Sequence, residues 1–279
     1  MFIGHQKIVS LLEKSLKKGK IAQAYLFVGP ESVGKFTLAK DFSEKIIDGE
    51  SPSLDLIIIE PEIETNKKGI VKEKEIKIEK IKEAQKELSF FPYVGKYKVL
   101  IINNSHKMTE SAQNALLKIL EEPNKTSVII LVTHKEDEII STIRSRCQKI
   151  QFNLVPPKVI GEKFAFLAMG RPGLAIKMKD NNEEVKLLKD IRQRFESLSG
   201  AGINERLKMA EEFSKNIPET VKKLEFLIWT VHEETMKNSE FSEIIKNLKV
   251  AEKINESLEQ IKNASVNSRL ILENLLLNI

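Results

Sequence analysis

The sequence predicts an α/β domain with a parallel sheet over residues 1–153, followed by an all-helical remainder. Three features lead to this fold class. Apolar runs of strand length alternate with segments of helical periodicity, a glycine-rich loop separates the first run from the helix after it, and no strand pattern follows residue 158. Strands that alternate with helices are typical of a parallel sheet covered by helices on both faces.

The expected elements follow in order along the chain. The first 20 residues have the apolar spacing of an amphipathic helix, and they do not resemble a signal peptide. Buried strands are expected at 24–28, 55–61, 98–102 and 127–133, and helices at 37–47, 76–90 and 109–123. The lysine-rich stretch 65–77 is expected to be a solvated loop or an edge segment. After residue 158 we expect short helices on either side of Gly170, and then longer helices from residue 183 onwards.

The composition is that of an ordinary soluble globular protein. The chain has 279 residues, 41% of them hydrophobic and 30% charged, with a net charge of +5. This length suffices for two or three domains. The single cysteine, Cys147, excludes a disulfide framework and a four-cysteine zinc site, so we expect no metal site and a cytoplasmic setting. No apolar run approaches the ~18 residues of a membrane span.

Residues 29–36, GPESVGKF, form a candidate phosphate loop. They follow a predicted strand, open a predicted helix, and match the pattern Gly-x-x-x-x-Gly-Lys with Gly29, Gly34 and Lys35. In such a loop the backbone N–H groups surround a phosphate and the lysine reaches its oxygens. The next position normally carries a Ser or Thr hydroxyl that binds Mg²⁺, but this chain has Phe36. Thr37 is displaced by ~100° around the helix and faces elsewhere.

The predicted strand 98–102 ends in Asn103 and Asn104. In a phosphate-loop ATPase, carboxylates at this point hold Mg²⁺ and activate water. A neutral amide cannot act as a general base. The alternative interpretation is a strand that simply ends in a turn, because asparagine suits turns. His106, shortly afterwards, is expected to be a loop histidine and not a ligand.

Two segments carry a family resemblance. HKMTESAQNALLKILEEP (106–123) and SVIILVTHKEDEIISTIRSRCQKIQF (127–152) resemble the clamp-loader branch of the AAA+ ATPases, and the segments 3–30 and 266–277 are similar to it as well. Within that branch the chain is most similar to the non-hydrolysing type of subunit in the bacterial DNA polymerase III clamp loader. The resemblance implies an AAA+ domain at 1–153, a helical lid at 154–200 and a helical collar at 201–279.

In this family each ATP site lies between two subunits, and the neighbouring chain contributes an arginine from a Ser-Arg-Cys motif. Here Ser145, Arg146 and Cys147 match that motif, so the resemblance implies that Arg146 acts in trans. The alternatives are that Arg146 is an ordinary surface arginine or that Arg144 is the finger. Cys147 is expected to be a small buried residue and not a nucleophile.

The resemblance also bears on the parts of an ATP site within this chain. The position of the lid arginine that senses the γ-phosphate corresponds to Gly173, and Arg171 is two residues away. Thr133 matches a polar sensor at a strand end. With Phe36 and the two asparagines, this makes three losses on one side of an ATP site. We therefore expect no intrinsic ATPase and no required cofactor, although ATP or ADP could be held without hydrolysis.

The family implies partners: a gamma/tau-type ATPase subunit, a delta-type subunit, the sliding clamp and primed DNA. Lys77, Lys80 and Lys82 are candidates for DNA contact, although a lysine face is usually only solvated. Two other hypotheses stay open. The chain could be an active, gamma/tau-like ATPase with unconventional ligands such as Glu60, Glu62 or Asp137, or a module that uses nucleotide only as a structural ligand.

Overall fold

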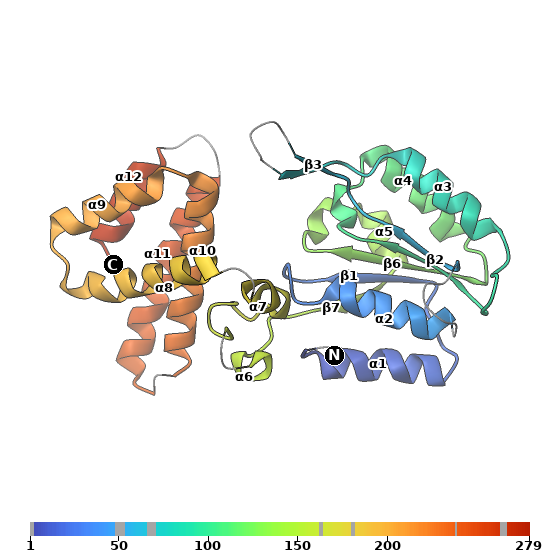
Figure 1. Cartoon of the computed structure of the whole chain (residues 1–279), viewed down its shortest axis with the longest axis horizontal. Coiled ribbons are helices and arrows are strands. Elements are labelled where there is room, and N and C mark those ends of the chain that lie inside the picture. The colour runs from blue at the N-terminus through green and yellow to red at the C-terminus, as the bar shows by residue number, and fades with distance from the viewer. Residues whose placement is uncertain are drawn as a thin grey trace. The chain divides into compact units, whose positions relative to one another are not determined.

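The computed structural model describes residues 3–47, 54–65, 71–161, 164–179, 182–237, 239–262 and 267–279. Contacts divide the chain into two compact units (Figure 1). The first comprises residues 1–163 with 170–174, and the second comprises 164–169 with 175–279. The division into a lid and a collar stays a prediction.

A five-stranded parallel sheet forms the centre of the first unit. Its order is β2-β5-β6-β1-β7, with β1 (Ala24–Val28), β2 (Leu56–Ile59), β5 (Lys98–Ile102), β6 (Ser127–Thr133) and β7 (Gln148–Gln151). Every residue of β1, β5 and β6 is buried, which explains why these strands read as continuous apolar runs. The predicted parallel sheet is confirmed.

Edge strand β7 has no counterpart among the expected strands. Only Ile150 of its four residues is buried, whereas Gln148, Lys149 and Gln151 face solvent. A short strand with a single buried side chain leaves no apolar run in the sequence. Its pairing with β1 therefore depends on tertiary structure and not on a local pattern.

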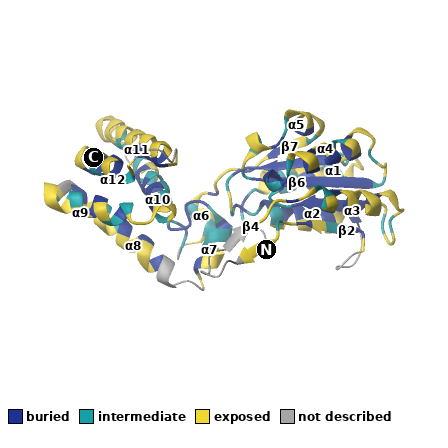
Figure 2. Ribbon diagram, turned by 90° about the horizontal axis from the view of Figure 1, so that it is seen from above, coloured by how far each residue is buried: buried dark blue, intermediate teal, exposed yellow. Residues whose placement is uncertain are grey.

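Helices cover both faces of the sheet (Figure 1). On one face, α1 (Gln6–Lys17) and α2 (Lys35–Ile47) enclose a core that contains Phe27 and Ile101. On the other, α3 (Ile78–Ser89), α4 (Glu110–Glu121) and the short α5 (Ser141–Arg146) enclose a core that contains Leu26 and Leu100. Adjacent residues of one strand thus serve opposite cores, and Figure 2 shows these strands as buried.

Two short segments depart from expectation. The stretch expected to be a loop or edge segment contains an antiparallel pair, β3 (Ile63–Thr65) with β4 (Val71–Glu73), outside the main sheet. Among the residues described between 157 and 170, helix is limited to α6 (Pro157–Ile160), and residues 164–170 form turns. Gly161 adopts φ 104°, which ends α6 early. The second short helix, α7 (Pro172–Met178), lies where it was expected.

From residue 182 onwards, the described part of the second unit folds into helices, as predicted. They are α8 (Asn182–Ser197), α9 (Ile203–Ser214), α10 (Ile217–Thr235), α11 (Phe241–Lys262) and α12 (Ser268–Leu277), with 3₁₀ turn η3 at Leu198–Gly200. Arg206 of α9 links the turn before this helix to the end of the chain, because its guanidinium donates to the carbonyls of Leu198, Ala201, Leu276 and Ile279. Within the described ranges, no helix combines the length and apolarity needed to cross a membrane.

Candidate functional site

The loop between β1 and α2 has the backbone of a phosphate loop. Gly29 adopts φ 146° and Gly34 adopts φ 99°, both unfavourable for other residues. A Cβ atom at Gly29 would lie 2.2 Å from the carbonyl oxygen of Phe152, so this position has no room for a side chain. Helix α2 begins at Lys35, as the motif requires.

The side chain of Lys35 is turned back into this loop. Its Nζ donates to the carbonyl oxygens of Gly29 at 2.7 Å and Pro30 at 2.5 Å, and only 6% of the residue is exposed. Burial lowers the pKa of Lys35 to about 8, with Glu31 opposing the shift and Arg171 adding to it. The ammonium group therefore directs two of its N–H donors at carbonyls of the loop itself.

The positions after Lys35 offer no hydroxyl to a metal at this loop. Phe36 packs against the core under α1 and α2, and the Nζ of Lys40 lies 4.7 Å from the centre of its ring. Thr37 is exposed. The side chains present at the loop thus do not fit the usual binding of Mg²⁺ and a β/γ-phosphate.

Gly173 closes the loop from the start of α7. Its backbone N–H donates to the carbonyl of Ser32 at 2.8 Å, and a Cβ atom at Gly173 would lie 2.9 Å from that same oxygen. A longer side chain at this position would have to displace backbone. Arg171, two residues earlier, is close enough to lower the pKa of Lys35, so the only arginine of this segment adds positive charge near the loop.

The two asparagines at the end of β5 donate to glutamates. Nδ2 of Asn103 lies 2.8 Å from Oε1 of Glu60, and Nδ2 of Asn104 lies 3.0 Å from Oε1 of Glu73. Asn104 also adopts φ 48°, a conformation that asparagine tolerates better than most residues. The asparagines therefore serve as turn residues and amide donors at this edge of the sheet.

The structure brings one of the three alternative carboxylates to this strand end. Glu60 is the partner of Asn103. Glu62 forms an ion pair with Lys80 at 2.9 Å, and Asp137 lies 3.9 Å from Nη1 of Arg144.

Arg146 lies at the end of α5 with its guanidinium exposed. Nη2 lies 2.8 Å from Oε1 of Glu121, and Nη1 donates to the carbonyl of Thr142 at 3.1 Å. Ser145 is exposed too, and its hydroxyl donates to the same carbonyl. Cys147 is mostly buried, and burial raises its pKa to about 12, which keeps the thiol protonated. The motif thus presents Ser145 and Arg146 to solvent and turns Cys147 inward.

Comparison with known proteins identifies the family. Residues 4–156, more than half of the chain, match the family model described as DNA polymerase III, delta subunit. The chain belongs to this family. It is accordingly a member of the DNA polymerase III clamp-loader proteins, with the α/β AAA+ fold described above.

Individual relatives of this clamp-loader chain carry two kinds of name. DNA polymerase III subunit delta' of Bacillus subtilis is 32% identical over 176 residues, which cover 56% of this chain and 50% of the relative. DNA polymerase III subunit tau of the same organism is 33% identical over 170 residues, covering 57% of this chain and 29% of the relative. The chain thus matches half or less of these relatives. A solved gamma subunit-related protein from Thermotoga maritima superposes with a TM-score of 0.47 at 22% identity, covering 96% of this chain and 97% of that one.

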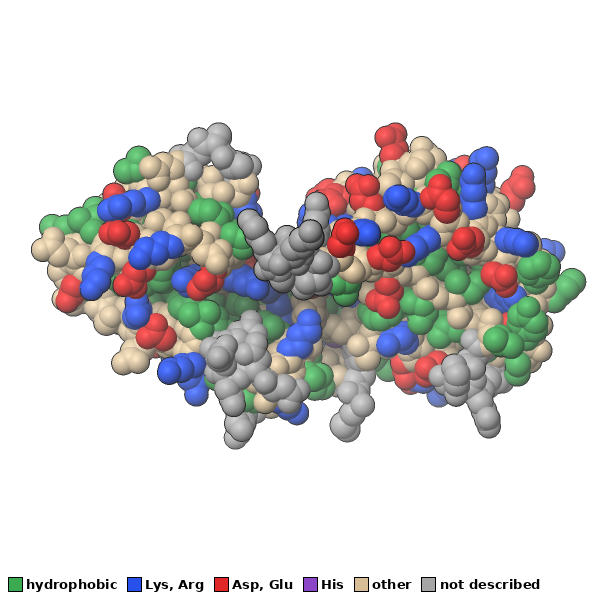
Figure 3. Space-filling view, turned by 45° about the horizontal axis from the view of Figure 1, so that its top comes forward, with side chains coloured by type: hydrophobic (Ala, Val, Ile, Leu, Met, Phe, Trp, Pro, Cys, Tyr) green, Lys and Arg blue, Asp and Glu red, His purple; other side chains and the backbone are tan. Residues whose placement is uncertain are grey.

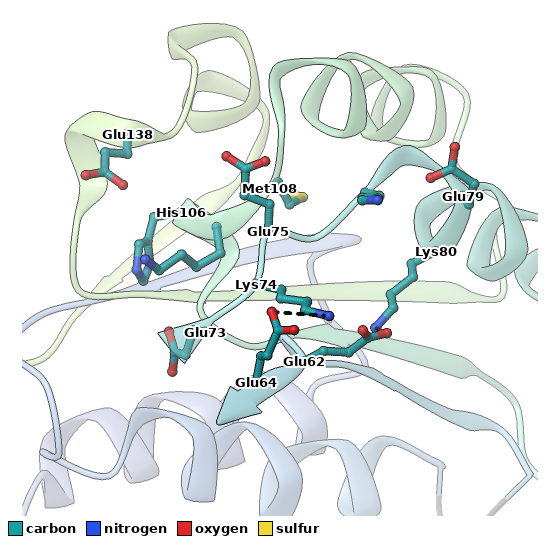
Figure 4. Close-up of a pocket in the computed structure, with 12 residues that line it drawn as sticks. Glu62, Glu64, Glu73, Lys74, Glu75, Glu79, Lys80, His106, Met108 and Glu138 are labelled. Atoms are coloured by element: carbon teal, nitrogen blue, oxygen red, sulfur yellow. Dashed lines mark ion pairs between the residues drawn. The ribbon is translucent and has the colours of Figure 1, made fainter. Parts of the chain in front are cut away.

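The lysines expected to contact DNA in this clamp-loader chain lie among acidic groups. Lys80 is paired with Glu62, Lys77 precedes α3, and Lys82 is exposed. Lys77 and Lys80 line a cavity of about 730 Å³. Figure 4 shows this cavity, where Lys74 also pairs with Glu64. Its charged lining comprises Glu62, Glu64, Glu73, Glu75, Glu79, Glu138, Lys74, Lys77, Lys80 and Lys107. Figure 3 likewise shows both signs of charge mixed on the face in view. This lining does not favour a phosphate backbone.

The sequence did not reveal the buried contacts beside β6. The Thr133 hydroxyl lies 3.2 Å from Nδ1 of His106, and the His106 ring packs edge-on against His134 at 4.3 Å between centroids. Burial, followed by the nearby His134, lowers the pKa of His106 to about 4, so the imidazole is neutral at pH 7. The expected loop histidine is therefore buried, and its imidazole is a hydrogen-bond partner of the hydroxyl of Thr133, the candidate sensor. Among the described residues, no group of three or more His, Cys, Asp or Glu is placed to bind a metal.

Proposed function

We propose that this chain is a delta'-type clamp-loader subunit that does not hydrolyse ATP and that supplies Arg146 in trans to the ATP site of a neighbouring subunit. In this role it helps to load the sliding clamp on primed DNA. The observation that carries the proposal is a contrast within the first unit: Lys35 is turned into its own loop, whereas Arg146 is presented at the surface.

The loss of hydrolysis is supported at four separate points. The loop ammonium already has two carbonyl partners, the metal-ligand position is Phe36, and the backbone of Gly173 packs against Ser32 where a sensor side chain would project. Asn103 offers an amide where a carboxylate would be needed. Four independent defects in one site are difficult to reconcile with turnover.

The exposed guanidinium supplies the complementary chemistry. During phosphoryl transfer, negative charge develops on the γ-phosphoryl oxygens, and an arginine brought across an interface stabilises that charge. Arginine suits this task because its planar fork binds two oxygens together and stays charged at any physiological pH. Such fingers contribute roughly 10³–10⁵ in rate.

The proposed partners are a gamma/tau-type ATPase subunit, a delta-type subunit, the sliding clamp and, within the complex, primed DNA. One surface loop of the first unit supports protein contacts. Phe91 and Val94 are 85% and 71% exposed, yet their loop is held in place because the Asp55 carboxylate accepts from the backbone N–H of Tyr93 and Val94. We further propose a cytoplasmic location, no required cofactor, and a lid and collar at 154–200 and 201–279.

The test is ATP hydrolysis by the reconstituted complex, stimulated by clamp and primed DNA. Arg146→Ala should lower hydrolysis at the site it faces by ~10³ or more, so that the complex loses the turnover of that site. Arg144→Ala is the matched control, because Arg144 lies two positions away on the same helix. Unchanged hydrolysis with Arg146→Ala, or an equal loss with Arg144→Ala, would contradict the proposal.

The alternative, an active gamma/tau-like ATPase, rests on Glu60, which the structure places beside Asn103. It predicts Mg²⁺-dependent hydrolysis by the purified chain alone, abolished in both Lys35→Ala and Glu60→Gln. Under the proposed function the isolated chain shows no such hydrolysis.

A further inference from the structure

The guanidinium of Arg146 is held at two of its nitrogens by this chain alone. The Thr142 carbonyl accepts from Nη1 within α5, and the Glu121 carboxylate binds Nη2 from the last turn of α4. Since the two contacts come from different elements, they fix both the position of the guanidinium and the orientation of its plane.

These two contacts leave most of the fork available. A guanidinium carries five N–H donors, and one donor on each terminal nitrogen suffices for Thr142 and Glu121. Three donors remain for groups outside the chain, and 36% of the side chain is exposed. A donor that is already oriented before its partner arrives loses less conformational entropy on contact.

The location of Glu121 suits a cation for a second reason. It is the last residue of α4, where the carbonyl end of the helix carries partial negative charge. Arg144, two positions before Arg146, lacks comparable support, because its nearest carboxylate oxygen, on Asp137, is 3.9 Å from Nη1. Of the two arginines of α5, Arg146 is therefore the one with an oriented guanidinium.

We propose that Glu121 is the positioning residue for Arg146. Together with the Thr142 carbonyl, its carboxylate holds the guanidinium so that the remaining N–H donors face the γ-phosphoryl oxygens of ATP bound by the neighbouring subunit. This inference rests on the proposed function of Arg146, and Glu121 itself does not touch the nucleotide.

The experiment uses the full chain in the reconstituted clamp loader, with kcat and KM for ATP measured in the presence of clamp and primed DNA. Glu121→Ala and Glu121→Gln are made with Arg146 intact and also in the Arg146→Ala background. Glu122→Ala is the matched control, because Glu122 is the exposed neighbour of Glu121 and forms no ion pair with the described residues.

Glu121→Ala should lower kcat about fivefold and leave KM within about twofold, because the finger acts mainly in the transition state. A fivefold change is about 1 kcal/mol, the upper end for an exposed ion pair. Glu121→Gln should retain part of the activity, since its amide oxygen can still accept from Nη2. In the Arg146→Ala background, Glu121→Ala should have no further effect, and Glu122→Ala should match the wild type.

Three outcomes would overturn this inference while leaving the proposed function intact, provided that Arg146→Ala is itself impaired. They are an unchanged kcat in Glu121→Ala, a faster kcat that would make the carboxylate a competitor of the phosphate, and an equal loss in the Arg146→Ala background. If Arg146→Ala has no effect, the proposed function fails, and this inference fails with it.

Discussion

The phosphate loop and the Ser-Arg-Cys helix are two basic sites in the same unit with opposite organisation. Lys35 is buried, and carbonyls of its own loop are its partners. Arg146 is exposed, and its partners contact only two nitrogens. Two of the three N–H donors of Lys35 are directed at its own loop, whereas three of the five donors of Arg146 remain available to a partner. Under the proposed function, the same unit has lost one phosphate site and kept its contribution to another.

The largest expected effect is on the pH dependence of the free energy of unfolding, which reports whether the Lys35 ammonium is buried. Its pKa is lowered from an ordinary value of 10.5 to about 8. Between those pH values the unfolded chain binds a proton that the folded chain has released, so the free energy of unfolding should rise with pH by about 3 kcal/mol. This gain should be absent from Lys35→Met. Urea unfolding of both proteins between pH 7.5 and 10.5 measures it, and parallel profiles would show that the ammonium is solvated.

The next effect tests whether Cys147, the residue after the exposed Arg146, is buried. The pKa of Cys147 is raised to about 12 by burial, so its thiolate is scarce at pH 8. Alkylation by iodoacetamide should be roughly 10²-fold slower than for a free cysteine, after allowing for the greater nucleophilicity of a high-pKa thiolate. Mass spectrometry of the native chain and of the urea-unfolded chain gives both rates. Equal rates would place Cys147 on the surface beside Arg146.

A smaller effect tests the closure of the phosphate loop. In Gly173→Ala the new Cβ would lie 2.9 Å from the Ser32 carbonyl oxygen, so the backbone must shift and the 2.8 Å hydrogen bond weakens. We expect a loss of about 1–2 kcal/mol in the free energy of unfolding. Gly200→Ala is the control, because a Cβ there meets no atom within 4 Å. If both variants melt at the same temperature as the wild type, α7 does not hold the loop.

The smallest effect concerns the stability contributed by the exposed site. Arg146→Ala in the isolated chain should change the free energy of unfolding by no more than ~0.5–1 kcal/mol, because exposed ion pairs contribute little to stability. Thermal melting followed by circular dichroism measures this. A loss well above that value would make Arg146 a structural residue and would remove the contrast with Lys35.

Much of the first unit could be predicted from the sequence, because buried parallel strands leave continuous apolar runs and turns leave glycines. The glycine loop and the helix of residues 110–121, with its Thr109 cap, appear where the pattern places them. Strand β7 could not be predicted, since three of its four side chains face solvent. The β3–β4 pair was missed as well, because it lies outside the main sheet and its strands, IET and VKE, contain no apolar run.

For the candidate site, sequence patterns point to particular residues but not to the orientation of their side chains. Sequence patterns indicate Gly29, Lys35 and Arg146, yet whether a lysine points into its own loop depends on three-dimensional packing. The Glu121–Arg146 contact joins positions 25 residues apart, and nothing in their local sequence links them. His106 lies between β5 and α4, as expected of a loop histidine, but its contact with His134, which follows a different strand, has no signal in the local sequence.

The position of β1 in the sheet has a consequence for biosynthesis. Both neighbours of β1 come late in the chain, since Ala24 pairs with Ile129 and Tyr25 with Gln148. At a translation rate of ~5–20 residues per second, an entirely apolar strand therefore waits roughly 5–20 s for its first sheet partner. Contacts between such distant residues also slow folding. The ribosome must deliver residues 127–133 before this sheet can close, and a nascent chain arrested earlier would present β1 as an unpaired, aggregation-prone strand.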